Sequence, residues 1–286
     1  MNLTILKTFI SIEETGSLVR ASEQLNVTQS TVTARLKQLE EELGQTLVMR
    51  HKSGVVLTAA GHKLLKYARV MTGLWLQARQ ETSLPDDVDS LCNMGCHMDL
   101  WPDFGRLVFD EIFRERKSTA LSIWPGDAAE LDRWFGEGLV DAALTAHPVA
   151  HDNQTIHLLH EEQLVLYSTQ PDGPIAFDPG YVFVDYGDDF RREHAAAYAM
   201  ADTSRVTFGC AVWAADHLAL RDGSAYLPER LAAPLVERGR LHALSLAPVF
   251  SRNVYLVTNR HALAKWSWLP DLINRLLLPA HASQAH

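Results

Sequence analysis

Small, neutral and basic side chains share one face of a helix predicted over residues 28–44. The face consists of Ser30, Thr31, Thr33, Ala34, Lys37 and Gln38. Hydroxyl, amide and ammonium groups can bond base edges and phosphates, and the small Ala34 allows close approach to a thymine methyl. Gln29 and Ser30 occupy the first turn, whose free N–H groups favour a phosphate. The pattern suits a helix in the major groove, and equally the solvated face of an ordinary amphipathic helix.

Cysteine and histidine residues gather at Cys92–His97 and at His157–His160. Such side chains bind soft metals or carry redox chemistry when several converge. Cys92 lies in an expected strand, where alternate residues face opposite sides, and no second Cys/His pair is near it. The two later histidines, at i and i+3 of a strand-like run, point apart. We therefore expect no metal site and no cofactor.

Motifs of the common enzyme classes are absent from the sequence, which lacks G-x-x-x-x-G-K-[ST], G-x-G-x-x-G, G-x-S-x-G and H-E-x-x-H. Arg191 and Arg192 could hold an anionic ligand. Their acidic neighbours Asp188, Asp189 and Glu193 favour a self-compensating helix start instead. We expect no catalytic residue, and the chain is predicted not to be an enzyme.

Two helices joined by a short turn must position the polar face. Ser17 can N-cap a helix that reaches Leu25, and Asn26 tolerates a left-handed turn. Thr28 can N-cap the second helix, which Gly44 ends. This is the pattern of a helix-turn-helix. The buried side of the second helix is expected to be Val32, Leu36, Leu39 and Leu43.

Residues 47–57 read as a strand, a basic turn and a second strand. The turn carries Arg50, His51 and Lys52 beside Gly54. A hairpin directly after such a helix is a wing, whose basic tip can reach the flanking DNA backbone or the minor groove.

The first quarter of the chain resembles the LysR-type transcriptional regulators. The shared residues are Leu3, Phe9, Gly16, Ser17, Ala21, Leu25, Thr28, Gln29, Ser30, Leu36, Leu39, Glu40, Leu43, Gly44, Leu47, Arg50, Leu57, Thr58, Ala60 and Gly61. Ser22 and Val48 depart from the family's usual alanine and phenylalanine, at expected packing positions. The resemblance implies DNA contacts by Gln29, Ser30, Thr31, Thr33, Ala34, Arg35, Lys37, Arg50, His51 and Lys52. Residues 50–52, 57–61 and 188–194 further resemble the family's HdfR-like branch, repressors associated with flagellar genes.

A long helix is expected from Thr58 to about Thr82. Leu64, Ala68, Met71 and Trp75 alternate spacings of four and three, as in a coiled-coil seam. Packing on its own domain is the alternative, but about 20 residues cannot bury this stripe against so small a head. The resemblance implies a linker helix that pairs two subunits and sets two DNA-reading helices about one DNA turn apart.

Strands and helices alternate after a hinge at residues 83–87, which favours an α/β sheet with parallel strands. The expected elements include a helix over 99–117 and strands over 156–168, 241–246 and 253–258. The resemblance implies two α/β lobes like those of periplasmic binding proteins. The expected fold is α+β overall, with a winged helix-turn-helix at 1–58, a linker helix and hinge at 59–88, and an effector-binding domain at 89–286. Lobe I would hold about 89–160 plus 256–286, and lobe II about 161–255.

Ligands of open α/β sheets bind beyond the carboxyl ends of strands, often on helix N-termini. This rule selects an effector site of Cys96, His97, Met98, Pro125, Asp127, Thr145, His147 and Phe190. The alternative is that these residues form loops and caps only. Asp127, followed three residues later by Glu130, matches a helix capping box.

The formal charge is unevenly distributed along the 286 residues. Residues 1–69 hold nine Lys+Arg and six Asp+Glu, giving +3, whereas the rest hold 17 and 29, giving -12. A basic head on an acidic body suits a DNA-binding protein whose larger part avoids phosphates. Three cysteines fit a reducing cytoplasm. Neither a signal peptide nor a membrane span is expected.

The sequence thus predicts a cytoplasmic transcriptional regulator that binds double-stranded DNA as a homodimer, extended to a tetramer, under control of a small-molecule effector. Two alternatives remain open at this point. One is an architectural DNA-binding protein without an effector, and the other is a ligand-binding or enzymatic body whose head serves only for oligomerisation.

Overall fold

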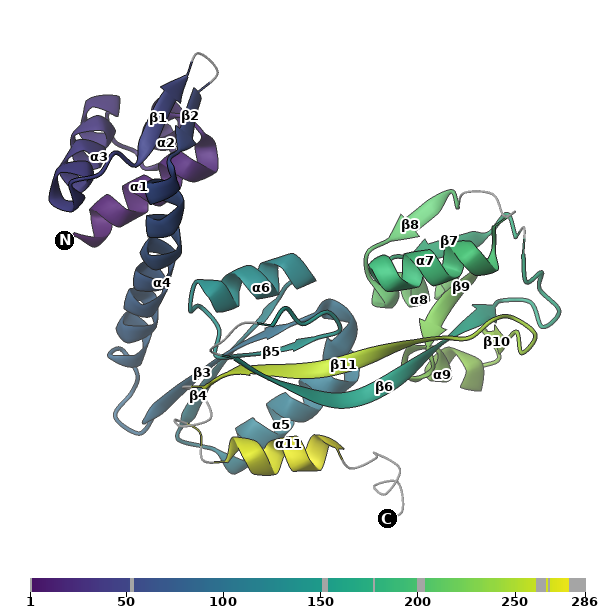
Figure 1. Cartoon of the computed structure of the whole chain (residues 1–286). Helices are drawn as coiled ribbons and strands as arrows, with labels where there is room; N and C mark the ends of the chain where they lie inside the picture. Colours follow the sequence, from purple (N-terminus) through teal and green to yellow (C-terminus); the bar gives the residue numbers. More distant parts are fainter. Residues whose placement is uncertain are drawn as a thin grey trace. The chain divides into compact units, whose positions relative to one another are not determined.

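A computed structural model describes residues 2–51, 54–150, 154–176, 178–199, 204–260, 266 and 268–277. The chain divides into two compact units (Figure 1). The first comprises Met1–Leu91 with Arg133–Val140, and the second comprises Cys92–Asp132 with Asp141–His286. Within the described ranges, no helix has both the length and the apolar character that a bilayer crossing requires.

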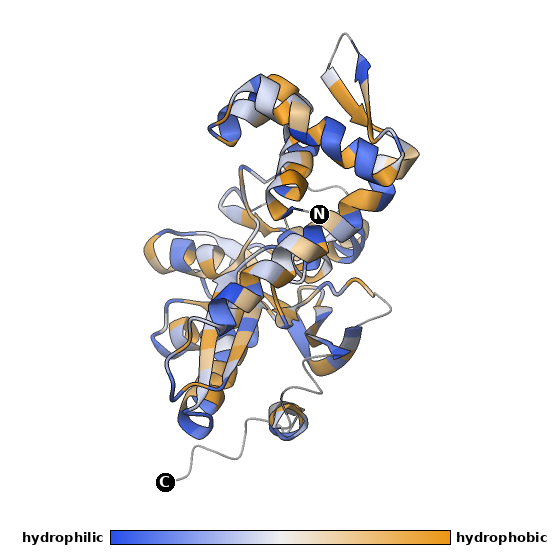
Figure 2. Ribbon diagram, turned by 90° about the vertical axis from the view of Figure 1, so that its left-hand side faces the viewer, coloured by the Kyte–Doolittle hydropathy of each residue, from blue (hydrophilic) through white to orange (hydrophobic). Residues whose placement is uncertain are grey.

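The head begins with three helices and a hairpin. They are α1 (Leu3–Thr15), α2 (Leu18–Gln24), α3 (Gln29–Leu43), β1 (Val48–His51) and β2 (Gly54–Leu57), followed by the long α4 (Ala59–Glu81). The antiparallel pairing of β1 with β2 confirms the predicted wing. Along these helices hydrophobic and hydrophilic segments alternate, as amphipathic helices require (Figure 2).

Local sequence signals explain where these helices begin and end. The hydroxyls of Ser17, Thr28 and Thr58 accept hydrogen bonds from backbone N–H groups three residues ahead, as expected of N-caps. Gly44 ends α3 at φ 62°, and Asn26 makes the turn between α2 and α3 at φ 52°. The predicted helix-turn-helix is therefore confirmed.

A single apolar core supports the head. Its buried residues come from α1, α2, α3, the hairpin and the start of α4: Ile5, Leu6, Phe9, Ile12, Leu18, Ala21, Val32, Leu36, Leu39, Leu47, Val48, Leu57 and Ala68. Leu43 was expected on the same buried stripe, and that expectation is wrong, because its side chain is 45% exposed. It lies in the last turn of α3, beyond the part of the helix that α1 and α2 cover.

The body contains one mixed sheet of nine strands, in the order β4-β3-β5-β11-β6-β9-β7-β8, with β10 paired to β6. The strands are β3 (Ser90–Cys96), β4 (Thr119–Pro125), β5 (Ala142–Thr145), β6 (Gln154–Ser168), β7 (Tyr181–Val184), β8 (Val206–Phe208), β9 (Ser224–Pro228), β10 (His242–Ala243) and β11 (Phe250–Asn259). The helices are α5 (Arg106–Glu115), α6 (Ala128–Gly136), α7 (Asp188–Ala197), α8 (Ala211–Leu220), α9 (Glu229–Glu237) and α11 (Leu269–Leu277).

Two long strands connect two separate cores. β6 and β11 pair antiparallel over most of their length, and Figure 1 shows both running from one group of helices to the other. Leu159 of β6 and Leu256 of β11 belong to the first core, which also includes Trp266. Leu164 of β6 and Phe250 of β11 belong to the second core. We call the halves built on these cores lobe I and lobe II, and the expected lobe boundaries at 160/161 and 255/256 fall inside β6 and β11.

Several expected elements differ from the observed ones. The helix expected over 99–117 begins only at Arg106, because a 3₁₀ turn (Met98–Leu100) and a π turn (Trp101–Gly105) with Pro102 near its start precede it. The strand expected over 241–246 is only the two residues of β10. The expected parallel strands are present, because β3 pairs parallel with β5, and β7 pairs parallel with β8 and β9. The long strands β6 and β11 differ, since they run antiparallel to their neighbours.

Candidate nucleic-acid interface and interlobe site

The polar face of α3 is largely open to solvent. Gln29, Ser30, Ala34 and Lys37 are exposed, and Thr31, Thr33 and Arg35 are half-buried. No acidic residue occurs between Gln29 and Leu39. The helix therefore offers hydroxyl, amide and ammonium groups around a small central alanine, the side-chain types that read a major groove.

Several of the predicted contact residues, Thr31 and Arg35 among them, are also engaged within the head. The Thr31 hydroxyl lies 2.8 Å from that of Thr28, the N-cap of α3. A guanidinium N–H of Arg35 donates to the Thr8 hydroxyl on α1 over 3.1 Å. Arg35 therefore ties α3 to α1 in this structure, on the flank of the face rather than at its centre.

The wing places two of its three predicted contacts on the surface. Arg50 and His51 are exposed at the end of β1, whereas Lys52 lies outside the described residues. Glu40, near the end of α3, accepts hydrogen bonds from the backbone N–H groups of Leu47 (2.7 Å) and Val48 (3.3 Å). The carboxylate thus fixes the start of the wing relative to α3, a role that the sequence did not suggest.

Of the four residues of the predicted coiled-coil seam on α4, two are covered by the head and two are exposed. Ala68 is fully buried in the head's core, and Leu64 packs against that core. Met71 and Trp75 are 36% and 50% exposed. The expectation that all four residues face a second subunit is wrong for Leu64 and Ala68, because the head's own core covers them. Sequence spacing missed the exposed residues Tyr67 and Leu74, on the same side of the helix as Met71.

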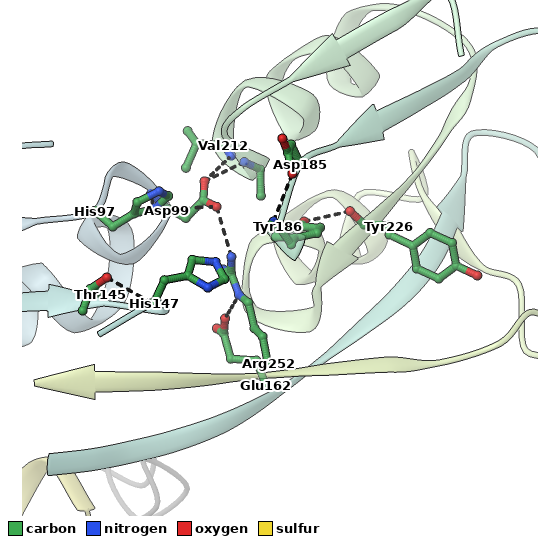
Figure 3. Close-up of polar contacts among 12 residues, drawn as sticks. His97, Asp99, Thr145, His147, Glu162, Asp185, Tyr186, Val212, Tyr226 and Arg252 are labelled. Carbon is green, nitrogen blue, oxygen red and sulfur yellow. Dashed lines mark hydrogen bonds and ion pairs between the residues drawn. The ribbon is translucent and has the colours of Figure 1, made fainter. Parts of the chain in front are cut away.

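The predicted effector residues fall into two groups. His97, Thr145 and His147 lie near one another in lobe I, at the ends of β3 and β5 (Figure 3). The Thr145 hydroxyl accepts from the backbone N–H of His147 over 3.1 Å. A Cβ placed on Gly187 of lobe II would lie 2.7 Å from the His147 ring, so the ring touches the other lobe. Both lobes therefore contribute to this interlobe site.

Among the other predicted effector residues, Cys96, Phe190 and Asp127 have structural roles. The predictions of Cys96 and Phe190 are wrong, because both side chains are buried in the cores of lobe I and lobe II respectively. Asp127 forms a capping box on α6, since its carboxylate accepts from Glu130 N–H over 2.8 Å and the Glu130 carboxylate accepts in return over 3.1 Å. Met98 is half-buried and Pro125 is exposed.

Buried ionic residues that the sequence analysis did not select lie at the centre of the site. Arg252 of β11 donates to Glu162 of β6 over 2.8 Å and to Asp99 over 3.2 Å. Arg230 of α9 also pairs with Glu162 and, over 3.0 Å, with Asp103. The alternation along the two strands could have identified this pair, because Arg252 and Glu162 occupy inward positions, where a charged residue needs a partner. The two residues face each other in register.

The buried charges shift the protonation equilibria of the site. Burial alone would raise the pKa of Asp99, but the Arg252 guanidinium and His97 beside it hold that pKa below its ordinary value. Burial would likewise raise the pKa of Glu162, but the guanidinium groups of Arg252 and Arg230 lower it. Burial lowers the pKa of His97 and of His147, and this favours the neutral imidazoles. Burial also raises the pKa of the Cys96 thiol to about 12, so it is no thiolate at neutral pH.

Comparisons with known proteins agree with the helix-turn-helix of the head. The model of the bacterial regulatory helix-turn-helix protein, lysR family, matches residues 3–62. The HTH-type transcriptional regulator HdfR of Escherichia fergusonii is 28% identical over 272 residues, which cover 93% of this chain and 96% of HdfR. This similarity confirms the expected resemblance to HdfR.

The fold is that of full-length LysR-family proteins of known structure. OxyR from Pseudomonas aeruginosa matches with a TM-score of 0.60 and 20% identity, over 100% of this chain and 99% of OxyR. LysG from Corynebacterium glutamicum, solved with a bound effector Arg, matches with a TM-score of 0.55 and 22% identity, over 97% and 98% of the two chains. Residues 3–62 therefore match the lysR-family helix-turn-helix, and the chain as a whole is similar to HdfR in sequence and to full-length LysR-family proteins in fold.

Proposed function

We propose that this protein is a transcriptional regulator that binds a dyad-symmetric DNA site as a dimer and responds to a small molecule bound between its lobes. The observation that carries the proposal is the exposed, acid-free face of α3 in a lysR-family helix-turn-helix. A bacterial regulator of this kind would act in the cytoplasm, where the DNA is, and would need no catalytic residue.

The proposed DNA contacts are of two kinds, contacts to base edges and contacts to the phosphate backbone. Thr33 and Ala34 would face base edges, because they lie near the middle of α3 with short side chains. Gln29, Ser30 and Thr31 in the first turn would bind a phosphate, together with Arg35 and Lys37 further along the helix. Arg50, His51 and Lys52 of the wing would contact the flanking backbone. Phosphate contacts would make the affinity strongly dependent on salt.

A second copy of this chain would cover the exposed side of α4. Tyr67, Met71, Leu74 and Trp75 are 65%, 36%, 54% and 50% exposed, and their spacing of four, three and one residues places them on one side of the helix. A contiguous apolar stripe of this kind marks an interaction surface. Paired α4 helices would set the two α3 helices roughly 34–36 Å apart, one turn of DNA. Further pairing of the bodies would give the expected tetramer.

The small molecule would contact His97, Thr145 and His147 of lobe I and the Arg252 guanidinium from β11. Their position between two lobes supports this assignment, because ligands of two-lobed α/β proteins bind where both lobes contribute polar groups. The effector Arg bound to LysG, a protein of the same fold, also supports it. The effector would change how the lobes pack and thereby the geometry of the paired DNA-binding heads.

Footprinting of the purified protein on DNA upstream of its own gene tests the proposal. We expect protection of a dyad-symmetric site, and loss of that protection in Thr33→Glu, which places a charge against the groove. Gln45→Glu is the matched control, because it adds the same charge to an exposed position just beyond α3 and should bind as the wild type does. Retained specific binding by Thr33→Glu would overturn the assignment of the α3 face. Weak binding without sequence preference would indicate an architectural protein instead.

A further inference from the structure

Asp99 connects the two lobes through its carboxylate. The residue lies in the 3₁₀ turn that follows β3 of lobe I, and its side chain is 2% exposed. One carboxylate oxygen accepts hydrogen bonds from the backbone N–H groups of Ala211 (2.6 Å) and Val212 (3.3 Å), which begin α8 of lobe II. The other oxygen accepts from Arg252 over 3.2 Å (Figure 3).

The partners of Asp99 form a complete carboxylate-binding arrangement. Helix α8 has no side-chain cap of its own, so its first N–H groups need an acceptor from elsewhere. A helix N-terminus and a guanidinium both favour a negative group, and here they converge on a single carboxylate. The Cys210 side chain also bonds to Asp99. Asp99 therefore occupies the position that a carboxylate ligand of this site would take.

Arg252 retains further capacity to bind an anion. Its Nη2 is buried and has no hydrogen-bond partner among the described residues, and the whole side chain is 6% exposed. The guanidinium lies over the Tyr186 ring of lobe II, 4.7 Å from its centroid. A cation held in this way, with the N–H groups of Nη2 unused, is well placed to hold a second oxygen ligand.

A second acid of the same segment provides a natural comparison. Asp103, in the π turn that follows, also bridges the lobes, because it pairs with Arg230 of α9 over 3.0 Å. Its side chain is 44% exposed, whereas that of Asp99 is 2% exposed. Exposed pairs contribute little to stability, and buried hydrogen-bonded ones are costly to break. Variants of Asp103 therefore measure the effect of losing a surface ion pair, and variants of Asp99 measure the effect of losing a buried carboxylate that joins the lobes.

We propose that Asp99 is a built-in carboxylate ligand that holds the lobes together without a small molecule, and that effectors acting at this site are carboxylates that compete with it. The statement about effectors rests on the proposed function, whereas the role of Asp99 does not. A tethered carboxylate has a high effective concentration at its own site. Free monocarboxylates should therefore leave the wild-type protein unaffected at concentrations that fill the site once Asp99 is removed.

Thermal unfolding of the full-length protein tests this role directly. Asp99→Ala should lower Tm by roughly 5–10 °C, because it leaves the Ala211 and Val212 N–H groups without their acceptor and removes one of the two carboxylates paired with the buried Arg252 guanidinium. Formate or acetate at about 0.1 M should restore a saturable part of that loss, as a ligand that binds only the folded state does. Sodium chloride at the same ionic strength should not. Asp103→Ala should lose at most about 2 °C and show no response specific to carboxylates.

Asp99→Asn keeps the proposal testable if Asp99→Ala does not fold. The amide retains the size of the side chain and one acceptor oxygen but removes the charge that faces Arg252. It should lower Tm by more than Asp103→Asn does, without rescue by formate, because the site is still filled. Equal losses in Asp99→Asn and Asp103→Asn would overturn the proposal, as would equal stabilisation of Asp99→Ala by formate and chloride. A failure to bind DNA would not affect these measurements, so the two proposals fail separately.

Discussion

The Glu40 carboxylate accepts a hydrogen bond from the backbone nitrogen of Leu47 over 2.7 Å, and this bond joins the helix proposed to read DNA to the wing. The first strand of the wing starts one residue later, and its Val48 N–H donates to the same oxygen over 3.3 Å. One side chain therefore satisfies two backbone donors and sets the angle at which the hairpin leaves α3.

Glu40→Ala should loosen the wing without unfolding the head. Loss of a charged acceptor for two backbone N–H groups should destabilise the hairpin by about 1.5–3 kcal/mol. Hydrogen exchange of the Leu47 and Val48 amides should accelerate roughly ten- to a hundred-fold, because 1.4 kcal/mol corresponds to a factor of ten when exchange requires local opening. Glu41→Ala is the control, since the Glu41 carboxylate lies in an exposed pair with Lys37. Unchanged exchange in Glu40→Ala would show that the hairpin is held by its core contacts alone.

Lys37→Ala should reduce the salt dependence of DNA binding. Lys37 is exposed on α3, and its proposed role is a single phosphate contact. Removal of one such contact should lower the slope of log K against log salt concentration by about 1, and should weaken binding to all sequences alike. Fluorescence anisotropy at several salt concentrations measures both effects. Lys117→Ala, which removes an exposed charge from the body, should leave the slope unchanged. An unaltered slope in Lys37→Ala would place Lys37 away from the DNA.

Local patterns predicted the head well because its signals are local. Ser17, Thr28 and Thr58 are N-caps as expected, and Asn26 and Gly44 make the left-handed turns. Where the prediction failed, a tertiary contact decided the outcome. The spacing of Leu64, Ala68, Met71 and Trp75 did not reveal that the core of the head would cover the first two of them.

The interlobe site was predicted less completely, because its residues meet only through tertiary structure. The rule that ligands bind at strand ends selected His97, Thr145 and His147, which lie near one another in the structure. It could not find the contact between Asp99 and the start of α8, which are separated by 112 residues in the sequence. Arg252 and Glu162 lie in the middle of their strands. A charged residue at an inward position is the only sequence signal there, and it does not indicate which residue is its partner.

Acidification should destabilise the body through the half-buried His97. Burial holds the pKa of His97 below its ordinary value of 6.5, although Asp99 opposes this shift. The unfolded chain then binds more protons than the folded one, so stability is fully present above pH 6.5 and is lost as the pH falls through the folded-state pKa. His97→Asn should flatten this part of a plot of Tm against pH, whereas the same change at the exposed His51 should not. Parallel profiles for His97→Asn and the wild type would contradict this.

Leu74→Arg should dissociate the protein into monomers. Leu74 is 54% exposed on the side of α4 that carries Met71 and Trp75, and a charge there would have to be buried between two paired helices. The dimer dissociation constant should rise at least about a hundred-fold, since an unpaired charge in a buried interface costs about 3–5 kcal/mol. Leu76→Arg is a closely matched control, because Leu76 is 44% exposed but lies two residues on, about 200° around the helix. Analytical ultracentrifugation should find monomers for the first variant and dimers or tetramers for the second. If Leu74→Arg assembled as the wild type does, the subunits would have to pair through another surface, and the spacing of the DNA half-sites would no longer follow from α4.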